Sequence, residues 1–210
     1  MRPMADSVVD LLSAEQRRRL AERMADAVIA HADELTALDA AIGDGDHGHN
    51  MKRGFEAVLA NVDALSGLPS PEFLRAIGHK LLTSVGGASG PLYATLFMTI
   101  GKLMPPSPSR PELVAALSGA VEAVKARGKS NVGQKTMIDV LAPALAEIAA
   151  GGGPGAVAGV ALRAAEATTP MLATRGRASF LGERSVGHMD PGARSLALII
   201  AAVCDEFGGQ

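Results

Sequence analysis

Residues 92–103 read LYATLFMTIGKL, a run that is apolar on nearly every side when it is wound into a helix. A helix that is apolar all round is expected to be buried among other helices. Apolar residues recur at helical spacing on both sides of this run, whereas convincing strand patterns are missing. We therefore expect an all-α fold in which residues 92–103 lie in the middle of a bundle.

The other expected helices have recognisable ends. Ser13 and Gln16 have the spacing of a capping box, in which each side chain satisfies a backbone N–H at a helix start. Pro111 stands in the first turn of another helix, and Gly128 is placed to end that helix in the left-handed conformation. We count about eight helices joined by short loops, and we expect a single domain over residues 1–210.

Composition excludes several classes of partner. The formal net charge of −2 disfavours nucleic acid or an anionic membrane surface as the main partner. Aromatic residues make up 3% of the chain, which leaves no platform for stacking bases. No run reaches the ~18 apolar residues of a membrane span. Cys204 has no partner for an internal disulfide, and residues 1–6 do not resemble a secretory signal. We expect a soluble, cytoplasmic protein.

Polar residues gather in an unusual place. Four glycine-rich segments between the expected helices carry polar clusters that a plain helical bundle would not need. These segments are residues 42–50, 86–91, 133–137 and 174–192. We therefore look for function in these segments rather than on the helix faces.

The first segment follows a long helix and is acidic. Asp39, Asp44 and Asp46 stand at spacings that cannot share one helix face, and the glycines among them predict a sharply turned loop. If the carboxylates converge, each pair at ~4 Å costs about 4 kcal/mol at an effective dielectric of roughly 20. Three such pairs approach a domain's whole stability of roughly 5–15 kcal/mol, so a converged cluster needs a cation. A solvated acidic turn with wider separations is the alternative.

The ligand types indicate which cation would bind. Oxygen ligands favour magnesium, manganese or calcium over zinc. An EF-hand calcium loop beginning at Asp44 would need a bidentate Glu at its twelfth position, where Phe55 stands. Zinc would need further His or Cys ligands beside His47 and His49, and the sequence has no second cluster to supply them. Magnesium fits best.

The second segment, Gly86-Gly87-Ala88-Ser89-Gly90, leads directly into the apolar helix. Free backbone N–H groups at a helix start attract anions, and glycines let a phosphate approach closely. A tight turn between two helices would use the same residues. The segment is not a Walker A loop, because it lacks the Lys-Ser/Thr ending and no strand precedes it.

The last segment is basic. Arg175, Arg177 and Arg184 stand near Asp190-Pro191-Gly192, with glycines interleaved among them. This pattern indicates a loop that makes close contacts rather than a helix surface, and arginine can bind a phosphate through two hydrogen bonds. A solvated charged face is the alternative, and a lone histidine such as His188 is more often structural than catalytic.

Taken together and in this order, the segments resemble the nucleotide-binding L subunit of dihydroxyacetone kinase. The resemblance covers essentially the whole chain. The segments that carry it are Asp44-x-Asp46-His47-Gly48-x-Asn50, Gly86-Gly87-Ala88-Ser89-Gly90-Pro91-Leu92, Gly182-Glu183-Arg184-Ser185 and Asp190-Pro191-Gly192-Ala193. The resemblance implies a closed barrel of eight antiparallel helices, with the nucleotide in the loops at one end.

The resemblance also implies binding residues. Asp39, Asp44 and Asp46 would hold two magnesium ions that bridge the phosphates of ADP or ATP. The residues that line those phosphates would be His47, Gly48, His49, Asn50, Ala88 and Ser89. The adenine and ribose end would be contacted by Gly128 and Met137, and the pocket would be completed by Arg177, Asp190, Pro191 and Gly192.

Two positions depart from the family pattern. Gln134 stands where the family usually has Asp before Lys-Thr-Met, and His49 replaces a commonly smaller residue. Neither departure touches the three aspartates. We therefore expect metal binding to be kept, whereas nucleotide affinity or substrate choice is open to change.

The implied activity is phosphoryl transfer, which mainly requires positioning and charge neutralisation. Two magnesium ions on adjacent phosphates supply the neutralisation. In the family, a separate K subunit binds dihydroxyacetone covalently through a histidine. This chain ends after one domain, which is typical of the type fed by the phosphotransferase system, in which a third subunit rephosphorylates bound ADP. The expected partners are therefore a K subunit and a donor subunit; a homodimer is left open.

Two other functions stay open at this point. One is an ATP-dependent kinase subunit for another small ketose such as erythrulose. The other is a nucleotide-sensing regulatory partner, since L subunits of this family can bind transcription regulators. The three aspartates favour catalysis, because sensing needs no two-metal geometry.

Overall fold

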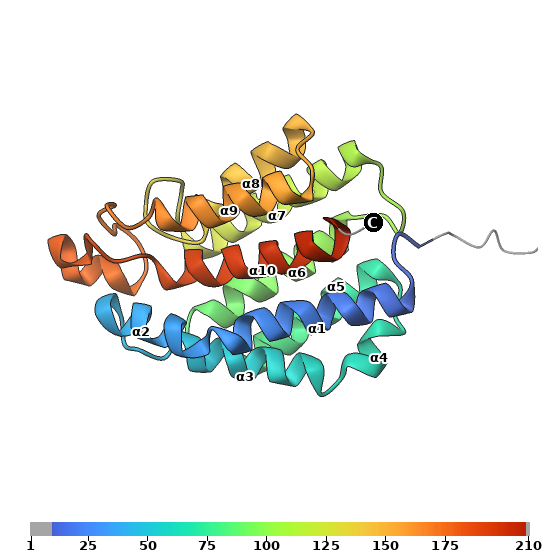
Figure 1. The fold of residues 1–210 in the computed structure, drawn as a ribbon, viewed down its shortest axis with the longest axis horizontal. Coiled ribbons are helices and arrows are strands. Elements are labelled where there is room, and N and C mark those ends of the chain that lie inside the picture. The colour runs from blue at the N-terminus through green and yellow to red at the C-terminus, as the bar shows by residue number, and fades with distance from the viewer. Residues whose placement is uncertain (1–9, 209–210) are drawn as a thin grey trace, which may run out of the picture.

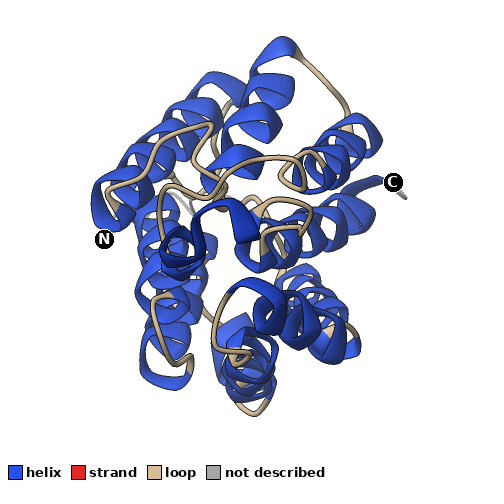
Figure 2. Ribbon diagram, turned by 90° about the vertical axis from the view of Figure 1, so that its left-hand side faces the viewer, coloured by secondary structure: helices blue, strands red, loops and turns tan. Residues whose placement is uncertain are grey.

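The structure, a computed structural model, describes residues 10–208, and none of these residues forms a strand (Figure 2). The all-α prediction is confirmed for them. Residues 1–6, in which we saw no secretory signal, lie outside the described part. The eight longer helices are α1 (Ala14–Ala30), α3 (His47–Leu59), α5 (Ser70–Ser84), α6 (Ser89–Leu103), α7 (Arg110–Gly128), α8 (Ile138–Ala150), α9 (Pro154–Glu166) and α10 (Pro191–Gly208). The shorter elements are α2 (Ala32–Ile42), α4 (Val62–Ser66) and the 3-10 helix η1 (Arg177–Ser185).

The eight longer helices run roughly along the long axis of the molecule (Figure 1), and their packing contacts close into a ring. Each packs against the next in the order α1, α3, α5, α6, α7, α8, α9 and α10, and α10 packs back against α1. Neighbours run in opposite directions, as expected of helices joined by short connections. Because the number of helices is even, the alternation also holds where α10 meets α1. The expected antiparallel barrel of eight helices is therefore present.

Large apolar side chains fill the inside of the ring. Phe55, Phe73, Tyr93, Ile138 and Leu196 are each at most 1% exposed, and they belong to one continuous core. Burying a side chain of this size contributes about 1.5–3 kcal/mol to stability. In the part of the chain that the structure describes, no helix has the length and the hydropathy needed to cross a membrane.

Helix α6 does not lie where we expected it. Tyr93 and Phe97 face the core, but Met98 and Leu103 are 37% and 47% exposed. The prediction of a central helix is therefore wrong. In a closed ring every helix has an outer face, and α6 is one member of the wall although its sequence is apolar on nearly every side.

The helix ends agree with the sequence in part. Ser13 and Gln16 form the predicted capping box at the start of α1. The long first helix breaks at His31, where Nδ1 lies 2.7 Å from the Ala27 carbonyl oxygen.

The predicted left-handed cap at Gly128 is wrong. The left-handed residue is Lys129, with a φ of 49°. A Cβ on Gly128 would lie 3.3 Å from Leu92, so this glycine serves the close contact of α7 with α6 instead.

Candidate functional site

The course of the chain brings the four polar segments to one end of the barrel. In an up-and-down ring, alternate connections lie at the same end. The segments connect α2 to α3, α5 to α6, α7 to α8 and α9 to α10, and these connections lie together at the left of Figure 1. Residues from all four line one cavity of about 470 Å³.

Three carboxylates converge on one wall of this cavity. Asp39 lies near the end of α2, and Asp44 and Asp46 lie in the loop that follows it. Carboxylate oxygens of the three residues lie within 4.8 Å of one another. The alternative of a solvated acidic turn with wider separations between the carboxylates is therefore wrong.

Backbone contacts fix the shape of the acidic loop. Asp39 Oδ2 accepts hydrogen bonds from the backbone N–H groups of Asp46 (2.9 Å) and His47 (3.1 Å). Gly45 has a φ of 73°, a conformation that side chains other than glycine rarely adopt. A Cβ on Gly43 would lie 2.1 Å from Asp39 Oδ1. Asp39 is thus the buried anchor of the loop, and Asp44 and Asp46 are its exposed members.

Positive charge reaches this cluster from the 3-10 helix η1. Arg177, at the start of η1, pairs with Asp44 at 2.5 Å between Nη1 and Oδ2. The cluster offers only oxygen ligands, which suit magnesium, manganese or calcium. A divalent cation would remove the mutual repulsion of the carboxylates more completely than one arginine does, so the three residues fit such an ion.

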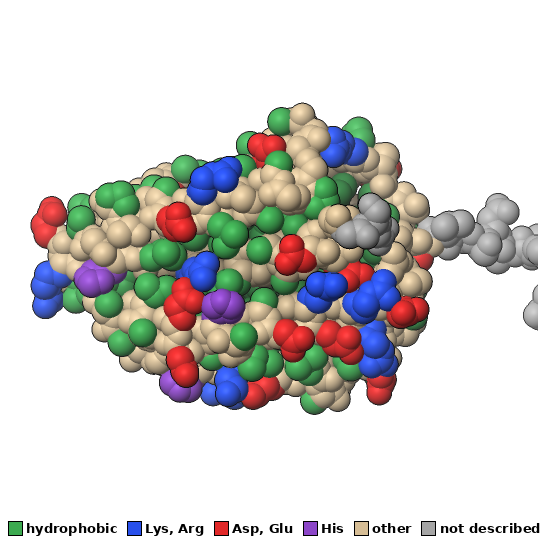
Figure 3. All heavy atoms as spheres, in the orientation of Figure 1, with side chains coloured by type: hydrophobic (Ala, Val, Ile, Leu, Met, Phe, Trp, Pro, Cys, Tyr) green, Lys and Arg blue, Asp and Glu red, His purple; other side chains and the backbone are tan. Residues whose placement is uncertain are grey.

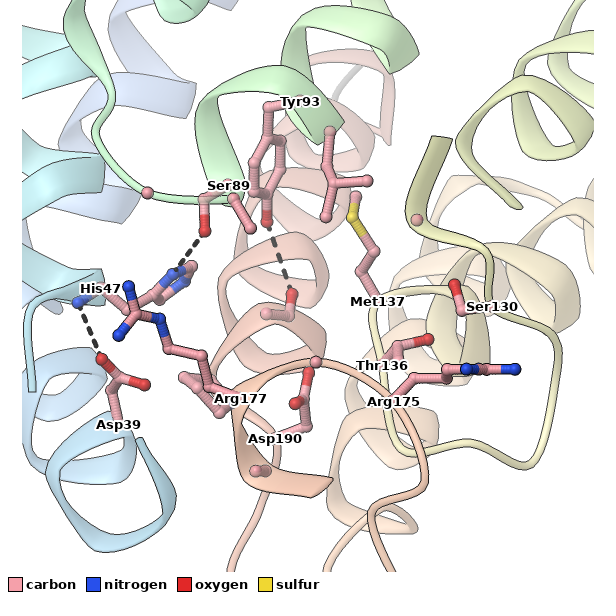
Figure 4. A pocket seen from close by; sticks show the side chains of 18 of the residues that line it. Asp39, His47, Ser89, Tyr93, Ser130, Thr136, Met137, Arg175, Arg177 and Asp190 are labelled. Atoms are coloured by element: carbon pink, nitrogen blue, oxygen red, sulfur yellow. Dashed lines mark hydrogen bonds between the residues drawn. The ribbon is translucent and has the colours of Figure 1, made fainter. Parts of the chain in front are cut away.

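A buried hydrogen-bonded chain lies beside the carboxylates (Figure 4). His47 Nδ1 lies 3.0 Å from Ser89 Oγ, and His47 Nε2 lies 2.8 Å from Ser195 Oγ. The hydroxyl of Tyr93 lies 2.7 Å from the same Ser195 oxygen. Burial lowers the pKa of His47 and raises that of Tyr93, which favours neutral side chains. The chain ties the acidic loop to the start of α6 and to α10.

The glycine segment opens α6 as predicted. Gly87 has a φ of 64°, and α6 begins at Ser89. Gly86, Gly87, Ala88 and Ser89 all line the cavity. The start of this helix therefore lies at the same cavity as the carboxylates, and backbone N–H groups at a helix start can bind an anion.

Three of the predicted phosphate residues do not line the cavity. Gly48 lies against α2, where a Cβ would meet the Ala32 carbonyl oxygen at 1.9 Å. His49 is exposed, with Nδ1 3.2 Å from Thr36 Oγ1. Asn50 is buried behind the glycine segment and accepts from Arg53 at 2.8 Å. Of residues 47–50, only His47 lines the cavity.

The loop between α7 and α8 forms a second wall. Gly128 and Met137, which the resemblance assigns to the adenine and ribose end, line the cavity together with Leu92 on α6 and Val124 on α7. Asp139, which the sequence analysis missed, shapes this loop: its carboxylate accepts from the N–H groups of Gly133 (2.5 Å) and Thr136 (2.8 Å).

Gln134, one of the two family departures, points away from this wall. Its Oε1 accepts from the N–H of Asn131 in the same loop at 2.8 Å. Gln134 and His49 are both absent from the cavity lining in the described structure. Their effects on affinity would therefore be indirect.

The segment between α9 and α10 forms the third wall. Arg177, Asp190, Pro191 and Gly192 line the cavity as predicted. Asp190 caps α10 by accepting from the N–H of Ala193 at 2.7 Å, and burial raises its pKa to about 7. Of the other basic residues, Arg175 lines the cavity; Arg184 and His188 are exposed and do not.

The chain is therefore a helical barrel with a polar cavity at one end. The walls of this cavity have groups that suit a cation and an anion side by side. A family model described as the DAK2 domain matches residues 41–205. The chain belongs to the DAK2 domain family, among the L subunits of dihydroxyacetone kinases.

Two curated relatives are similar over most of their length. The chain is 40% identical over 170 residues to the ADP-binding subunit DhaL of PEP-dependent dihydroxyacetone kinase 1 from Listeria innocua, covering 80% of this chain and 84% of that one. It is 38% identical over 188 residues to the corresponding Escherichia coli subunit, covering 85% and 90%.

Solved structures share the fold. The native dihydroxyacetone kinase of C. freundii superimposes with a TM-score of 0.75 at 26% identity, covering 98% of this chain. Its complex with AMP-PNP and Mg²⁺ gives a TM-score of 0.70 at 25% identity. This chain spans 37% and 36% of those two longer chains.

Proposed function

We propose that this chain is the magnesium- and ADP/ATP-binding subunit of a dihydroxyacetone kinase, and that its bound nucleotide passes a phosphoryl group to dihydroxyacetone held by a separate K subunit. The observation that carries the proposal is the cavity that the converged carboxylates of Asp39, Asp44 and Asp46 line together with the glycine-rich start of α6. The names of the relatives, which include ADP binding and PEP dependence, support the same function and a phosphoprotein as the phosphoryl donor.

The carboxylates would hold magnesium, which supplies charge neutralisation between the nucleotide phosphates. Asp39 keeps its position through its two backbone hydrogen bonds, so one ligand is fixed in advance. Asp44 and Asp46 are exposed at the cavity and available to the ion. When a cation shares Asp44, Arg177 becomes available to a phosphate oxygen.

The remaining walls suit the other parts of a nucleotide. The start of α6 offers N–H groups to a phosphate. Leu92, Val124 and Met137 give an apolar surface at the opposite side of the cavity, where a purine ring could lose water. Ser130 and Thr136 stand beside them with hydroxyl groups that can donate or accept (Figure 4).

Thermal unfolding tests the proposed binding. A ligand that binds only the folded state stabilises it by about 2.7 kcal/mol at a hundredfold excess over Kd. For a chain of this size we expect ADP with magnesium to raise Tm by about 5–10 °C. ADP in EDTA should give little shift, because the uncompensated carboxylates repel the phosphates. An equal shift in EDTA would contradict the metal-bridged site.

A surface feature supports the separate partner. Phe180, three residues along η1 from Arg177, is 89% exposed. An apolar aromatic side chain in this position is typical of an anchor residue at a protein interface. It lies at the cavity end of the barrel, where a partner must present the ketose.

Replacing Phe180 by serine is expected to raise the KM for the K partner at least about tenfold. Turnover at partner concentrations well below KM should fall by the same factor. Magnesium–ADP affinity and Tm should stay at wild-type values, because Phe180 does not line the cavity. The matched control is Leu103→Ser, which removes an exposed apolar side chain at the opposite end of α6. Equal effects of the two variants would contradict docking at the cavity end.

A further inference from the structure

The segment between α9 and α10 forms a closed loop over the cavity. We call residues 169–187 the hood. Its ends meet where the N–H of Gly187 donates to the Thr169 carbonyl oxygen at 2.9 Å. A second contact joins the two sides, because Ser185 Oγ accepts from the N–H of Ala173 at 3.0 Å. The hood is therefore a closed segment whose two ends are hydrogen-bonded to each other.

The hood carries two of the cavity's basic residues. Arg175 and Arg177 both line the cavity; in Figure 4 they lie on either side of Asp190, with Arg177 extending toward His47 and Arg175 lying beside Thr136. Arg177 also reaches the acidic loop through its ion pair with Asp44. The position of the hood therefore decides where these guanidinium groups lie.

A buried lysine occupies the junction of the hood's two ends. Lys135 is 1% exposed, and it belongs to the loop between α7 and α8 rather than to the hood. Its Nζ donates to the carbonyl oxygens of Ser185 (2.6 Å), Met171 (3.0 Å) and Thr169 (3.3 Å). One ammonium group thus bonds to both sides of the hood.

Lys135 also connects the hood to a second cavity wall. Lys135 and the two residues that follow it, Thr136 and Met137, all line the cavity, as do Leu92 and Val124. The hood and this wall have a further contact, since the N–H of Thr174 donates to the Gln134 carbonyl oxygen at 3.4 Å. The Lys135 side chain and one backbone hydrogen bond therefore join two walls of the cavity.

The surroundings make this an unfavourable place for an ordinary lysine. Burial lowers the pKa of Lys135, and the nearby Asp190 carboxylate opposes this effect only in part. Its backbone has a φ of 60°, which is strained for a residue with a side chain. Strain and a buried charge persist together where the surrounding structure requires them, and they are concentrated at functional sites.

We propose that Lys135 is a positioning residue that fixes the hood against the loop between α7 and α8, so that Arg175 and Arg177 face the cavity. Without the Lys135 ammonium group, the carbonyl oxygens of Thr169, Met171 and Ser185 lose their shared hydrogen-bond donor. The hood then loosens while the barrel stays folded. The consequence for nucleotide affinity rests on the proposed function; the consequence for the hood does not.

The test compares Lys135→Gly and Lys135→Met with wild type. Glycine adopts a φ of 60° without strain, so Lys135→Gly removes the side chain without straining the backbone. In the nucleotide-free protein, we expect amide hydrogen exchange within residues 172–187 to rise at least about tenfold, with unchanged exchange in α1 and α5. The Kd for magnesium–ADP should rise about tenfold or more.

The matched control is Lys129→Gly. Lys129 lies in the same loop and also has a positive φ, of 49°, but its side chain is exposed. Exchange in the hood and magnesium–ADP affinity should both stay at wild-type values in this control.

Three outcomes would overturn the proposal. The first is wild-type exchange in the hood of Lys135→Gly. The second is a similar rise in α1 and α5, which would mean that the whole barrel depends on Lys135. The third is failure of both variants to fold, which has the same meaning. If wild-type protein does not bind magnesium–ADP at all, the proposed function fails, and the exchange experiment still decides the role of Lys135.

Discussion

Asp46→Asn is expected to abolish magnesium-dependent nucleotide binding and to leave the helical circular dichroism largely intact. The carboxylate of Asp46 lies within 4.8 Å of those of Asp39 and Asp44 and is exposed at the cavity. Loss of residues that merely support metal ligands costs about 10–100-fold in metal affinity, so loss of a ligand itself should cost at least about 100-fold. Titration calorimetry with ADP and magnesium measures the effect, and Asp44→Asn should behave in the same way.

The choice of Asp46 keeps binding and folding separate. Asp39 is unsuitable, because its carboxylate accepts two backbone hydrogen bonds that shape the loop. Asp33→Asn is the control, since Asp33 is exposed on α2 and its replacement makes the same change in net charge. Wild-type nucleotide affinity in Asp46→Asn would remove the basis for the metal site.

Much of the fold follows from the sequence, because helical periodicity and helix ends are local properties. The capping box at Ser13 and the proline start of α7 appear in the structure as expected. The position of α6 could not be found in this way. Periodicity shows which faces of a helix are apolar, but not how many neighbours share them. In a ring of eight, Met98 on the outer face stays exposed in spite of its chemistry.

The acidic cluster could be predicted because charge repulsion constrains it. Three aspartates in a glycine-rich turn either spread apart or surround a cation, and the structure brings them together. The roles of single residues were harder to find. Gly48 resembles a phosphate-loop glycine in sequence, yet it serves the contact of α3 with α2. Lys135 and Ser195 act through long-range contacts that no local spacing reveals.

The location of the cavity could also be predicted from the sequence. The four polar segments fall in alternate connections of an up-and-down bundle, and alternate connections must lie at one end. Helix order alone therefore places residues as distant as Asp44 and Arg177 at the same end of the barrel, where they form an ion pair. Which side chains then point into the cavity depends on local backbone geometry, such as the break at His31, which the pattern does not encode.

By itself, this chain is expected to form no triose phosphate from free dihydroxyacetone, ATP and magnesium. The cavity walls have groups suited to metal, phosphate and base. Transfer also needs an acceptor hydroxyl placed in line with the phosphoryl group and protected from water, which one open cavity end does not provide. Adding the K partner, with either ATP or the phosphorylated donor subunit, should start turnover. A coupled assay for triose phosphate, with each component omitted in turn, measures this.

The omission series also separates the alternatives. Turnover that needs the phosphorylated donor subunit, with catalytic amounts of ADP, supports the phosphoprotein-dependent type; turnover with ATP alone supports a direct ATP-dependent kinase. Replacing dihydroxyacetone by erythrulose identifies the preferred ketose, which the K partner's pocket rather than this cavity should determine. Sugar phosphate formed from this chain, ATP and magnesium alone would show that the two-subunit mechanism is wrong. In that case the acceptor would have to bind within the cavity, between the start of α6 and the hood, and Phe180→Ser would leave turnover unchanged.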